Sequence, residues 1–84
     1  MLAFSVSEAT VIKASAGVVK SVSVLASGDT AGTINDAATV ASANAANASL
    51  PIPTTPDTRI TDRVHLVGIV ALPAAGQTLS IEFF

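Results

Sequence analysis

The stretch that decides the fold is Val64–Phe84, which reads VHLVGIVALPAAGQTLSIEFF. Its first part, Val64–Leu72, is an apolar run rich in β-branched residues, and its last part, Gln77–Phe84, alternates polar and apolar side chains. Alternation with a period of two is typical of a strand that has one buried side and one solvent-facing side. Between the two parts, Pro73 presets a turn-like φ and Gly76 tolerates positive φ. The stretch therefore predicts a C-terminal β-hairpin in an all-β protein.

Short runs of Val, Ile and Thr recur along the rest of the chain and are separated by Gly, Pro, Asn, Asp and Ser, which is strand and turn composition. We predict strands at residues 2–7, 9–14, 18–26, 31–35, 48–52, 63–72 and 77–84. We predict structural turns at Gly17, Gly28, Gly32, Asp36, Pro73 and Gly76. About seven short strands indicate a single all-β domain, residues 1–84, folded as a small β-sandwich or a jelly-roll-like module.

The middle of the chain, Ala37–Ser49, reads AATVASANAANAS and is the least strand-like part. Alanine favours helix, and Asp36 is a suitable cap for a first turn. The segment has no apolar stripe with which a helix would dock, and Asn44 and Asn47 are typical loop residues. We therefore expect an irregular loop that contains one helical turn.

The composition limits the classes of partner. The chain has 84 residues, no cysteine and one histidine, and much of its hydrophobic content is alanine. A core this small is normally supported by disulfides, metals or oligomerisation, so we expect self-association to complete it. Four basic residues and a net charge of −2 cannot form the positive stripe that a nucleic acid requires. The longest apolar run, Val64–Ala75, is shorter than the roughly 20 residues of a membrane helix. We expect neither a nucleic acid nor a membrane as partner.

The residues offer little catalytic chemistry. His65 lies beside Asp62 and Arg63, but a hydrolase also needs a nucleophile and an orienting acid near the histidine. We therefore place His65 at a surface or subunit contact. The oxygen-bearing run Asp29–Asp36 lacks the ligand spacing of a calcium loop and is better explained by turn chemistry. We expect no enzymatic activity, no cofactor and no metal.

The three aromatic residues, Phe4, Phe83 and Phe84, lie at the two ends of the chain. If the ends occupy adjacent strands, these side chains form one apolar patch, which would serve either as core or as an anchor for a partner. Alternation directs Phe84 away from Phe83, so at least one of the two points out of the core. The predicted interface residues are Leu2, Phe4, Phe83, Phe84, Arg59 and Arg63.

One group of proteins shares the order of these motifs. The stretches are Val11–Gly17 (VIKASAG), Val22–Leu25 (VSVL), Gly32–Thr39 (GTINDAAT), the Ala/Asn-rich segment and Gly76–Ile81 (GQTLSI). Together they resemble a group of small β-sandwich virion proteins of tailed bacteriophages, and the resemblance covers almost the whole chain. Two positions depart from that pattern. Asn35 stands where the group tends to have an aromatic residue, and His65-Leu66 stands where it tends to have Gly-Leu.

The resemblance implies a structural role and no catalytic residues. The expected function is that of a capsid cement or decoration protein on the outer surface of the virion, with the major capsid protein as its partner and a homotrimer as the preferred oligomer. Its chain ends or the loop Pro51–Arg63 would cross the junction between neighbouring shell subunits. The alternative is a tail or fibre component with a glycan-binding or adhesion role, although the chain has no Trp or Tyr to form a sugar platform.

Overall fold

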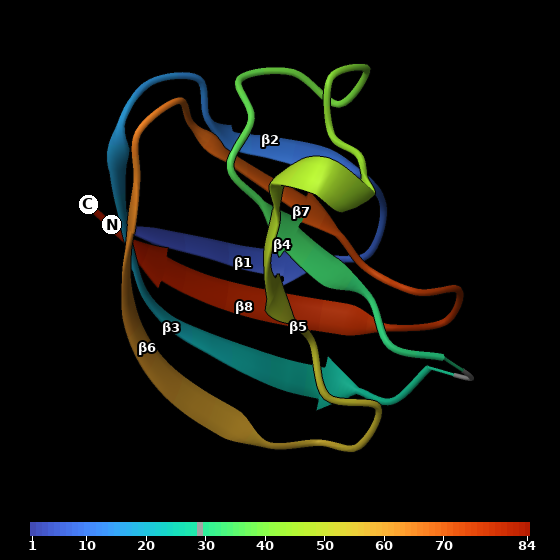
Figure 1. Ribbon diagram of the computed structural model, residues 1–84. Coiled ribbons are helices and arrows are strands. Elements are labelled where there is room, and N and C mark those ends of the chain that lie inside the picture. Colours follow the sequence, from blue (N-terminus) through green and yellow to red (C-terminus); the bar gives the residue numbers. More distant parts are fainter. Residues whose placement is uncertain (29) are drawn as a thin grey trace.

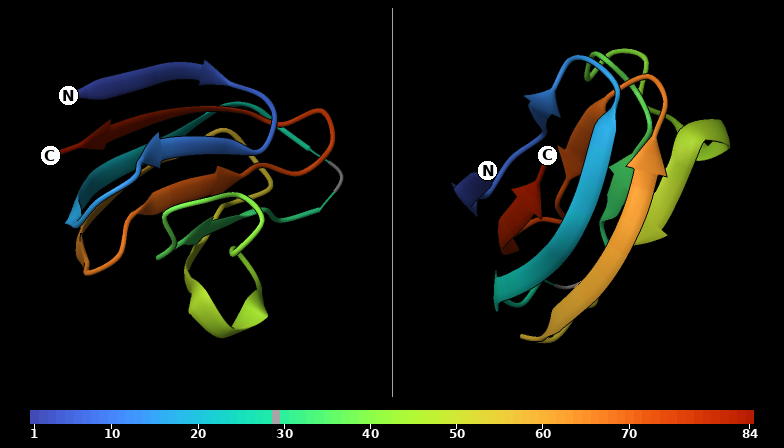
Figure 2. Two further views of the ribbon diagram at one scale, coloured as in Figure 1. Left: turned by 90° about the horizontal axis from the view of Figure 1, so that it is seen from above. Right: turned by 90° about the vertical axis from the view of Figure 1, so that its left-hand side faces the viewer.

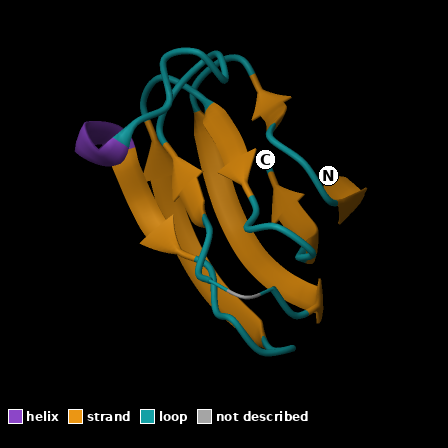
Figure 3. Ribbon diagram, turned by 90° about the vertical axis from the view of Figure 1, so that its right-hand side faces the viewer, coloured by secondary structure: helices purple, strands orange, loops and turns teal. Residues whose placement is uncertain are grey.

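The computed structural model describes residues 1–28 and 30–84, apart from the side chain of Phe4. Asp29 and the predicted interface role of the Phe4 side chain lie outside the described residues. The strands are β1 (Leu2–Val6), β2 (Thr10–Lys13), β3 (Gly17–Ala26), β4 (Thr33–Asn35), β5 (Ala48–Pro51), β6 (Thr58–His65), β7 (Ile69–Leu72) and β8 (Thr78–Phe83). The 3₁₀ turn η1 (Ala45–Asn47) precedes β5 and confirms the predicted helical turn in the alanine-rich loop. It is the one helical element in the described part of the chain (Figure 3).

The strands form two antiparallel four-stranded sheets that pack face to face (Figure 1). The order is β1-β8-β3-β6 in sheet A and β2-β7-β4-β5 in sheet B. The prediction of a small all-β sandwich is thereby confirmed. No helix in the described ranges is long and apolar enough to cross a membrane.

The predicted C-terminal β-hairpin is wrong. β7 pairs with β2 and β4 in sheet B, whereas β8 pairs with β1 and β3 in sheet A. Each strand already has a neighbour on both sides, so the two cannot pair with each other. The connection between them crosses from one sheet to the other as an arch. Its turn spans Ala74–Gln77, one residue later than predicted, with Gln77 N donating to Ala74 O at 3.0 Å and with Gly76 at φ 81°.

The predicted strand 63–72 is also wrong, because it is two strands in different sheets. β6 ends at His65 in sheet A and β7 begins at Ile69 in sheet B, and residues 66–68 form the turn between them. The apolar run is continuous in sequence, but only its second half is buried in the core, whereas Val64, Leu66 and Val67 of its first half are exposed. β7 is buried on both of its faces, since the consecutive residues Ile69, Val70 and Ala71 have no exposed surface.

The core lies between the two sheets and draws on nearly every strand. Its buried members are Val6, Val19, Val22, Val24, Ile34, Ile52, Ile69, Ala71, Leu79, Ile81 and Phe83. The accessible surface of the molecule is 4333 Å², close to the roughly 4,600 Å² expected of a compact monomer with a mass of 8.3 kDa. The single chain therefore has the accessible surface of a compact monomer, and the expected self-association stays a prediction.

The two sheets differ in what covers their outer faces. Residues 36–47 lie over the outer side of sheet B (Figure 2), where Asn35, Ala37 and Val70 are buried. The outer side of sheet A carries several exposed side chains, including Leu2, Ile60, Val64 and Phe84. Any partner that covers a sheet face would therefore meet sheet A.

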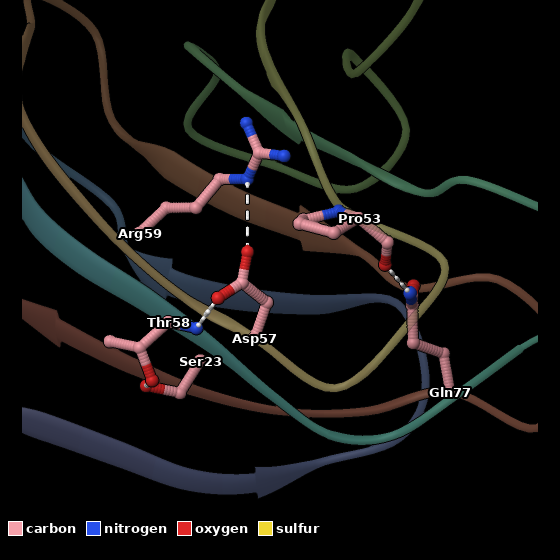
Figure 4. A network of polar contacts seen from close by, with 6 residues as sticks. All are labelled: Ser23, Pro53, Asp57, Thr58, Arg59 and Gln77. Atoms are coloured by element: carbon pink, nitrogen blue, oxygen red, sulfur yellow. Dashed lines mark hydrogen bonds and ion pairs between the residues drawn. The ribbon is translucent and has the colours of Figure 1, made fainter.

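The arch after β7 is held by the buried side chain of Gln77. Its Oε1 accepts a hydrogen bond from Ala74 N at 3.0 Å, and its Nε2 donates to Pro53 O at 2.7 Å. The second contact ties the arch to the segment that follows β5 (Figure 4). The approach of Gly32 to this region is close, because a Cβ there would overlap the carbonyl oxygen of Leu72.

Candidate interaction surfaces

The turn between β6 and β7 is clamped by a carboxylate from a distant part of the chain. Asp36, which follows β4, accepts hydrogen bonds from three successive backbone N–H groups. Its Oδ2 lies 3.1 Å from Leu66 N, and its Oδ1 lies 2.8 Å from Val67 N and 3.1 Å from Gly68 N. Successive N–H groups directed at one anion form a site that favours negative charge. Asp36 therefore fixes the shape of a turn to which the chain returns about thirty residues later.

The hydrogen bonds determine the protonation of this carboxylate. Partial burial, the largest single influence, raises the pKa of Asp36, because it penalises the charged form. The three backbone N–H donors of Val67, Gly68 and Leu66, together with the field of His65, outweigh it, so the pKa lies below its ordinary value of 3.8. Asp36 is therefore ionised at neutral pH, and the clamp is charge-assisted.

The buried ring of His65 also holds the turn between β6 and β7. Its ring is only 1% exposed, which corrects the prediction that it lies at a surface or subunit contact. The Nδ1 atom lies 2.7 Å from Gly68 O, and because a carbonyl only accepts, Nδ1 carries the proton. The Nε2 atom lies 2.6 Å from the Ser49 hydroxyl, and in the neutral ring it accepts a hydrogen bond from that hydroxyl. The histidine thus joins β6, the turn and β5.

The contact between Ser49 and His65 has the distance of a nucleophile and its general base, but the surroundings do not suit catalysis. The histidine ring is buried, so a substrate cannot approach it. The N–H groups of residues 66–68 in the adjoining turn already donate to Asp36 and are not free to stabilise an oxyanion. We therefore assign Ser49 and His65 to the support of the turn.

The supported turn presents two large apolar side chains to solvent. Leu66 is 79% exposed and Val67 is 53% exposed, although the backbone beneath them is held by Asp36 and His65. A rigid backbone lowers the conformational entropy lost when such side chains enter a partner. We call Leu66 and Val67 the apolar tip. Sequence reasoning missed the tip because it placed both residues inside a strand; the isolated Gly68 in the apolar run was the signal of a break.

The amides of Asn44 and Asn47 are used inside the loop over sheet B. Asn44 Oδ1 accepts from Ala46 N at 2.8 Å, and Asn47 Oδ1 accepts from Asn35 Nδ2 at 2.8 Å. Both side-chain N–H₂ groups donate to Ser42 O. These amides therefore hold the loop in shape and do not form the open polar ring that a sugar site requires.

One half of the outer face of sheet A carries five apolar side chains. Val18 lies opposite Val64 in β6, and it exchanges backbone hydrogen bonds with Phe84 at 3.0 and 2.9 Å. In the neighbouring row, Leu2 of β1 and Ile60 of β6 stand on the same side of the sheet. We call these five residues the apolar half-face. It surrounds the ends of the chain, which lie side by side (Figure 1).

The other half of the same face is polar. Ser23 lies opposite Ser80 and Thr58, and its hydroxyl is 3.1 Å from that of Thr58 (Figure 4). The two halves are not uniform, because Glu82 and Ser21 lie between Leu2 and Ile60. The exposed Leu25 follows Ser23 in β3.

A groove opens between the edge strands β5 and β6, with a cavity volume of about 420 Å³. Its apolar lining consists of Val22, Leu50, Pro51, Pro53 and Ile60. Its polar lining consists of Arg59 and Thr61. Arg59 lies opposite Val22 and so projects from the inner side of β6, where its Nε is 3.9 Å from Asp57 Oδ2 (Figure 4). At that distance the ion pair is weak, and the guanidinium is accessible to a ligand.

The structure sorts the predicted interface residues. Leu2, Arg59 and Arg63 are exposed, and Phe84 is 58% exposed. Phe83 is only 8% exposed and belongs to the core, so its prediction as an interface residue is corrected. The two arginines and the aromatic residue lie on different surfaces, because Arg59 faces the groove and Phe84 faces the outer side of sheet A.

The predicted turn residues fall mostly in connections. Gly28 and Gly32 lie between β3 and β4, Asp36 follows β4, and Pro73 and Gly76 lie in the arch. The prediction of a turn at Gly17 is wrong, because Gly17 is the first residue of β3 and residues 14–16 form the bend before it. No group of three or more His, Asp or Glu side chains that could hold a metal occurs within residues 1–28 and 30–84.

Comparisons of the chain with protein-family models, with curated proteins and with solved structures find no match.

Proposed function

We propose that the chain is a structural protein of a bacteriophage virion, a cement or decoration protein that binds the outside of the capsid and stabilises it. The sequence support is the resemblance of its motifs to small virion proteins of tailed bacteriophages. The observation that carries the proposal is the apolar tip, because Leu66 and Val67 are exposed on a turn fixed by Asp36 and His65. Such a rigid apolar projection fits a depression at a junction between shell subunits.

The stabilising mechanism is a linkage effect. A protein that binds the assembled shell and not its free subunits favours the assembled state by the free energy of binding. Many weak contacts on a symmetric lattice then add up, so one copy needs only modest affinity. The shape of the chain suits this role, since it covers its own core and exposes its binding groups on a fixed backbone.

The first test is the abundance of the chain in particles of the phage whose genome encodes it. Quantitative mass spectrometry is expected to find a copy number near that of the major capsid protein. A handful of copies per particle would instead favour the tail or fibre role and would contradict the cement proposal.

The second test uses the tip. Particles that lack the chain are expected to release their DNA at a lower temperature, and added wild-type protein is expected to restore heat resistance. Leu66→Asp should weaken binding to these particles at least about tenfold, because binding would then bury a carboxylate where the wild type buries an apolar side chain. Leu25→Asp on β3 is the matched control, since Leu25 is also exposed but lies away from the tip. Equal heat resistance of particles with and without the chain would reject the proposal.

A further inference from the structure

The outer edge of β6 is open, because no strand of the described residues pairs with it, and it borders the groove shared with β5. We propose that this edge binds an extended segment of a partner protein, which adds to β6 as an antiparallel strand. The segment carries an apolar residue and, two positions later, an acidic residue. The inference does not rest on the capsid role, because the groove and the apolar tip share no residue.

The ladder between β3 and β6 shows which backbone groups of β6 face the open edge. Val24 N donates to Asp57 O at 2.8 Å, so these residues form a hydrogen-bonded pair of the antiparallel ladder. Such pairs alternate with pairs whose N–H and C=O groups point outward. Two residues further along each strand, Val22 and Arg59 pair in the same way, so the next residue, Ile60, directs its N–H and C=O outward. Ile60 therefore offers one donor and one acceptor to an added strand.

The open edge is limited at both ends. At its start, Thr58 N already donates to Asp57 Oδ1 at 2.8 Å (Figure 4). Further along, Asp62 has a φ of 46° in the irregular part of the ladder. Beyond it, His65 contacts Ser49 of β5, which joins the two edge strands. The site therefore admits about three or four residues of an extended chain, or roughly 10 to 13 Å.

Alternation determines where the side chains of an added strand would point. The residue opposite Ile60 would stand on the outer face of sheet A, beside the exposed Ile60 side chain, which belongs to both the apolar half-face and the groove. In an antiparallel strand, the preceding residue would lie opposite Thr61 and the following residue opposite Arg59, both on the inner side. These two positions therefore face the groove.

The groove suits an apolar side chain at the first of these positions. Leu50, Pro51 and Pro53 supply its lining on the side of β5, and its volume of about 420 Å³ admits a large side chain. The Thr61 hydroxyl donates to Val19 O at 2.6 Å and is therefore already used within the sheet. An apolar side chain that enters the groove removes apolar surface from water on both partners, which favours binding.

The charge at the second position favours a carboxylate. Arg59 Nε is 3.9 Å from Asp57 Oδ2, and the two terminal nitrogens of Arg59 point away from Asp57 (Figure 4). Arg63 projects from the same side of β6, because it lies opposite the buried Val19. The inner side of β6 therefore has one positive charge in excess. A guanidinium can hold a carboxylate through two parallel hydrogen bonds, so an acidic residue is preferred to a basic one.

The test uses a short peptide, acetylated and amidated at its ends, with a Leu-Val-Glu centre flanked by threonines. Fluorescence anisotropy of a labelled peptide is expected to give a dissociation constant on the order of 100 µM, because the contact is smaller than a standard protein interface. In nuclear magnetic resonance spectra of the chain, the Ile60 amide is expected to shift when the peptide is added, whereas the amides of Leu66 and Val67 are not.

Variants of the chain and of the peptide test the two parts of the contact. Arg59→Glu should weaken binding of this peptide at least about tenfold and strengthen binding of a Leu-Val-Lys peptide by a similar factor, because the charge is reversed. Methylation of the valine nitrogen removes the N–H that Ile60 O would accept and should also weaken binding at least about tenfold. Val11→Asp on β2, at the other edge of sheet B, is the control and should leave binding unchanged.

Absence of binding at millimolar peptide would overturn the inference, and so would equal binding of the Leu-Val-Glu and Leu-Val-Lys peptides to the wild-type chain. Undiminished binding of the methylated peptide would show that the groove takes an apolar carboxylate without strand addition. A shift of the Ile60 amide with chain concentration alone would assign the edge to a second copy instead. Circular dichroism confirms that each variant is folded, which separates loss of binding from loss of structure.

Discussion

At the scale of single residues, the motif Gly32–Asp36 acts through positions that are far apart in sequence. Thr33 Oγ1 donates to Asn35 Oδ1 at 2.7 Å, Asn35 holds the loop over sheet B, and Asp36 clamps the turn at residues 66–68. Asp36 was expected to be a turn residue or a helix cap. Asp36 does lie in the turn that follows β4. The N–H groups from which it accepts hydrogen bonds, however, belong to the turn between β6 and β7.

Asp36→Asn is expected to lower the free energy of unfolding by about 2 kcal/mol at pH 7, because the amide is a weaker acceptor and directs an N–H₂ group at a backbone donor. The folded-state pKa lies below 3.8, so the stabilising effect of Asp36 is fully present above that pH and is lost as the pH falls toward the folded-state value. The difference between wild type and variant should therefore shrink in acid. Urea unfolding at neutral pH and below pH 3.8 measures both effects.

Asp62→Asn is the control for this substitution. Asp62 is exposed and forms a surface ion pair with Lys20, so the change should cost less than about 1 kcal/mol. An Asp36→Asn variant as stable as this control would show that the clamp does not hold the turn.

At the scale of elements, the arch between β7 and β8 depends on one backbone conformation. Gly76 has a φ of 81°, a region that L-residues with a Cβ avoid, while the space around it is open, since the nearest atom to an added Cβ is 4.0 Å away. Strain and not crowding therefore determines the cost of a substitution at this position.

Gly76→Ala is expected to lower the free energy of unfolding by about 1 kcal/mol, because alanine is strained at positive φ. Gly76→Asn should cost less, since asparagine tolerates the left-handed region better than other residues. Chemical unfolding with an unchanged m-value measures both. Equal losses for the two variants would indicate that the side chain meets an obstacle and that the φ value is not the cause.

The elements also show where sequence reasoning succeeds and where it ends. The burial of Leu79 and Ile81 on the inward side of β8 follows from local alternation. Phe83 shares that side and lies in the core, although it is also predicted at an interface. The turn residues around Gly76 suit a hairpin and an arch equally, so they cannot decide which strands pair. The pairing of β7 is determined by β2 and β4, which form hydrogen bonds with its two edges and leave no edge for β8. The break after His65 likewise depends on Asp36, about thirty residues earlier.

The candidate surfaces follow the same division. Exposed charges and a projecting Phe84 can be read from strand boundaries and alternation, and both were predicted to lie at an interface. The groove cannot be predicted from the sequence. Leu50 and Arg59 line it together only because β5 and β6 are edge strands of different sheets. The apolar tip was hidden by the continuous hydrophobicity of the run that contains it.

At the scale of the whole molecule, the single chain has the accessible surface expected of a compact monomer. The first residue is part of that fold, because Met1 O accepts from Phe83 N at 2.8 Å and extends the pairing of β1 with β8. Stability and assembly can therefore be separated by experiment.

The chain is expected to unfold in one cooperative transition whose thermal midpoint does not depend on protein concentration, because its accessible surface is that of a compact monomer. Circular dichroism melts at several concentrations measure this midpoint. A midpoint that rises with concentration would show that association of copies stabilises the fold, because binding to the folded state raises its stability by mass action.

The place of β8 in sheet A also governs how the molecule can form in the cell. β8 lies between β1 and β3, yet it is the last of the eight strands to be synthesised. Until it leaves the ribosome, β1 and β3 have open edges and no shared neighbour, and pairings between such distant segments form slowly. The nascent chain thus passes through a period in which its strand edges can join other chains, and pairing of β8 with β1 and β3 ends that exposure.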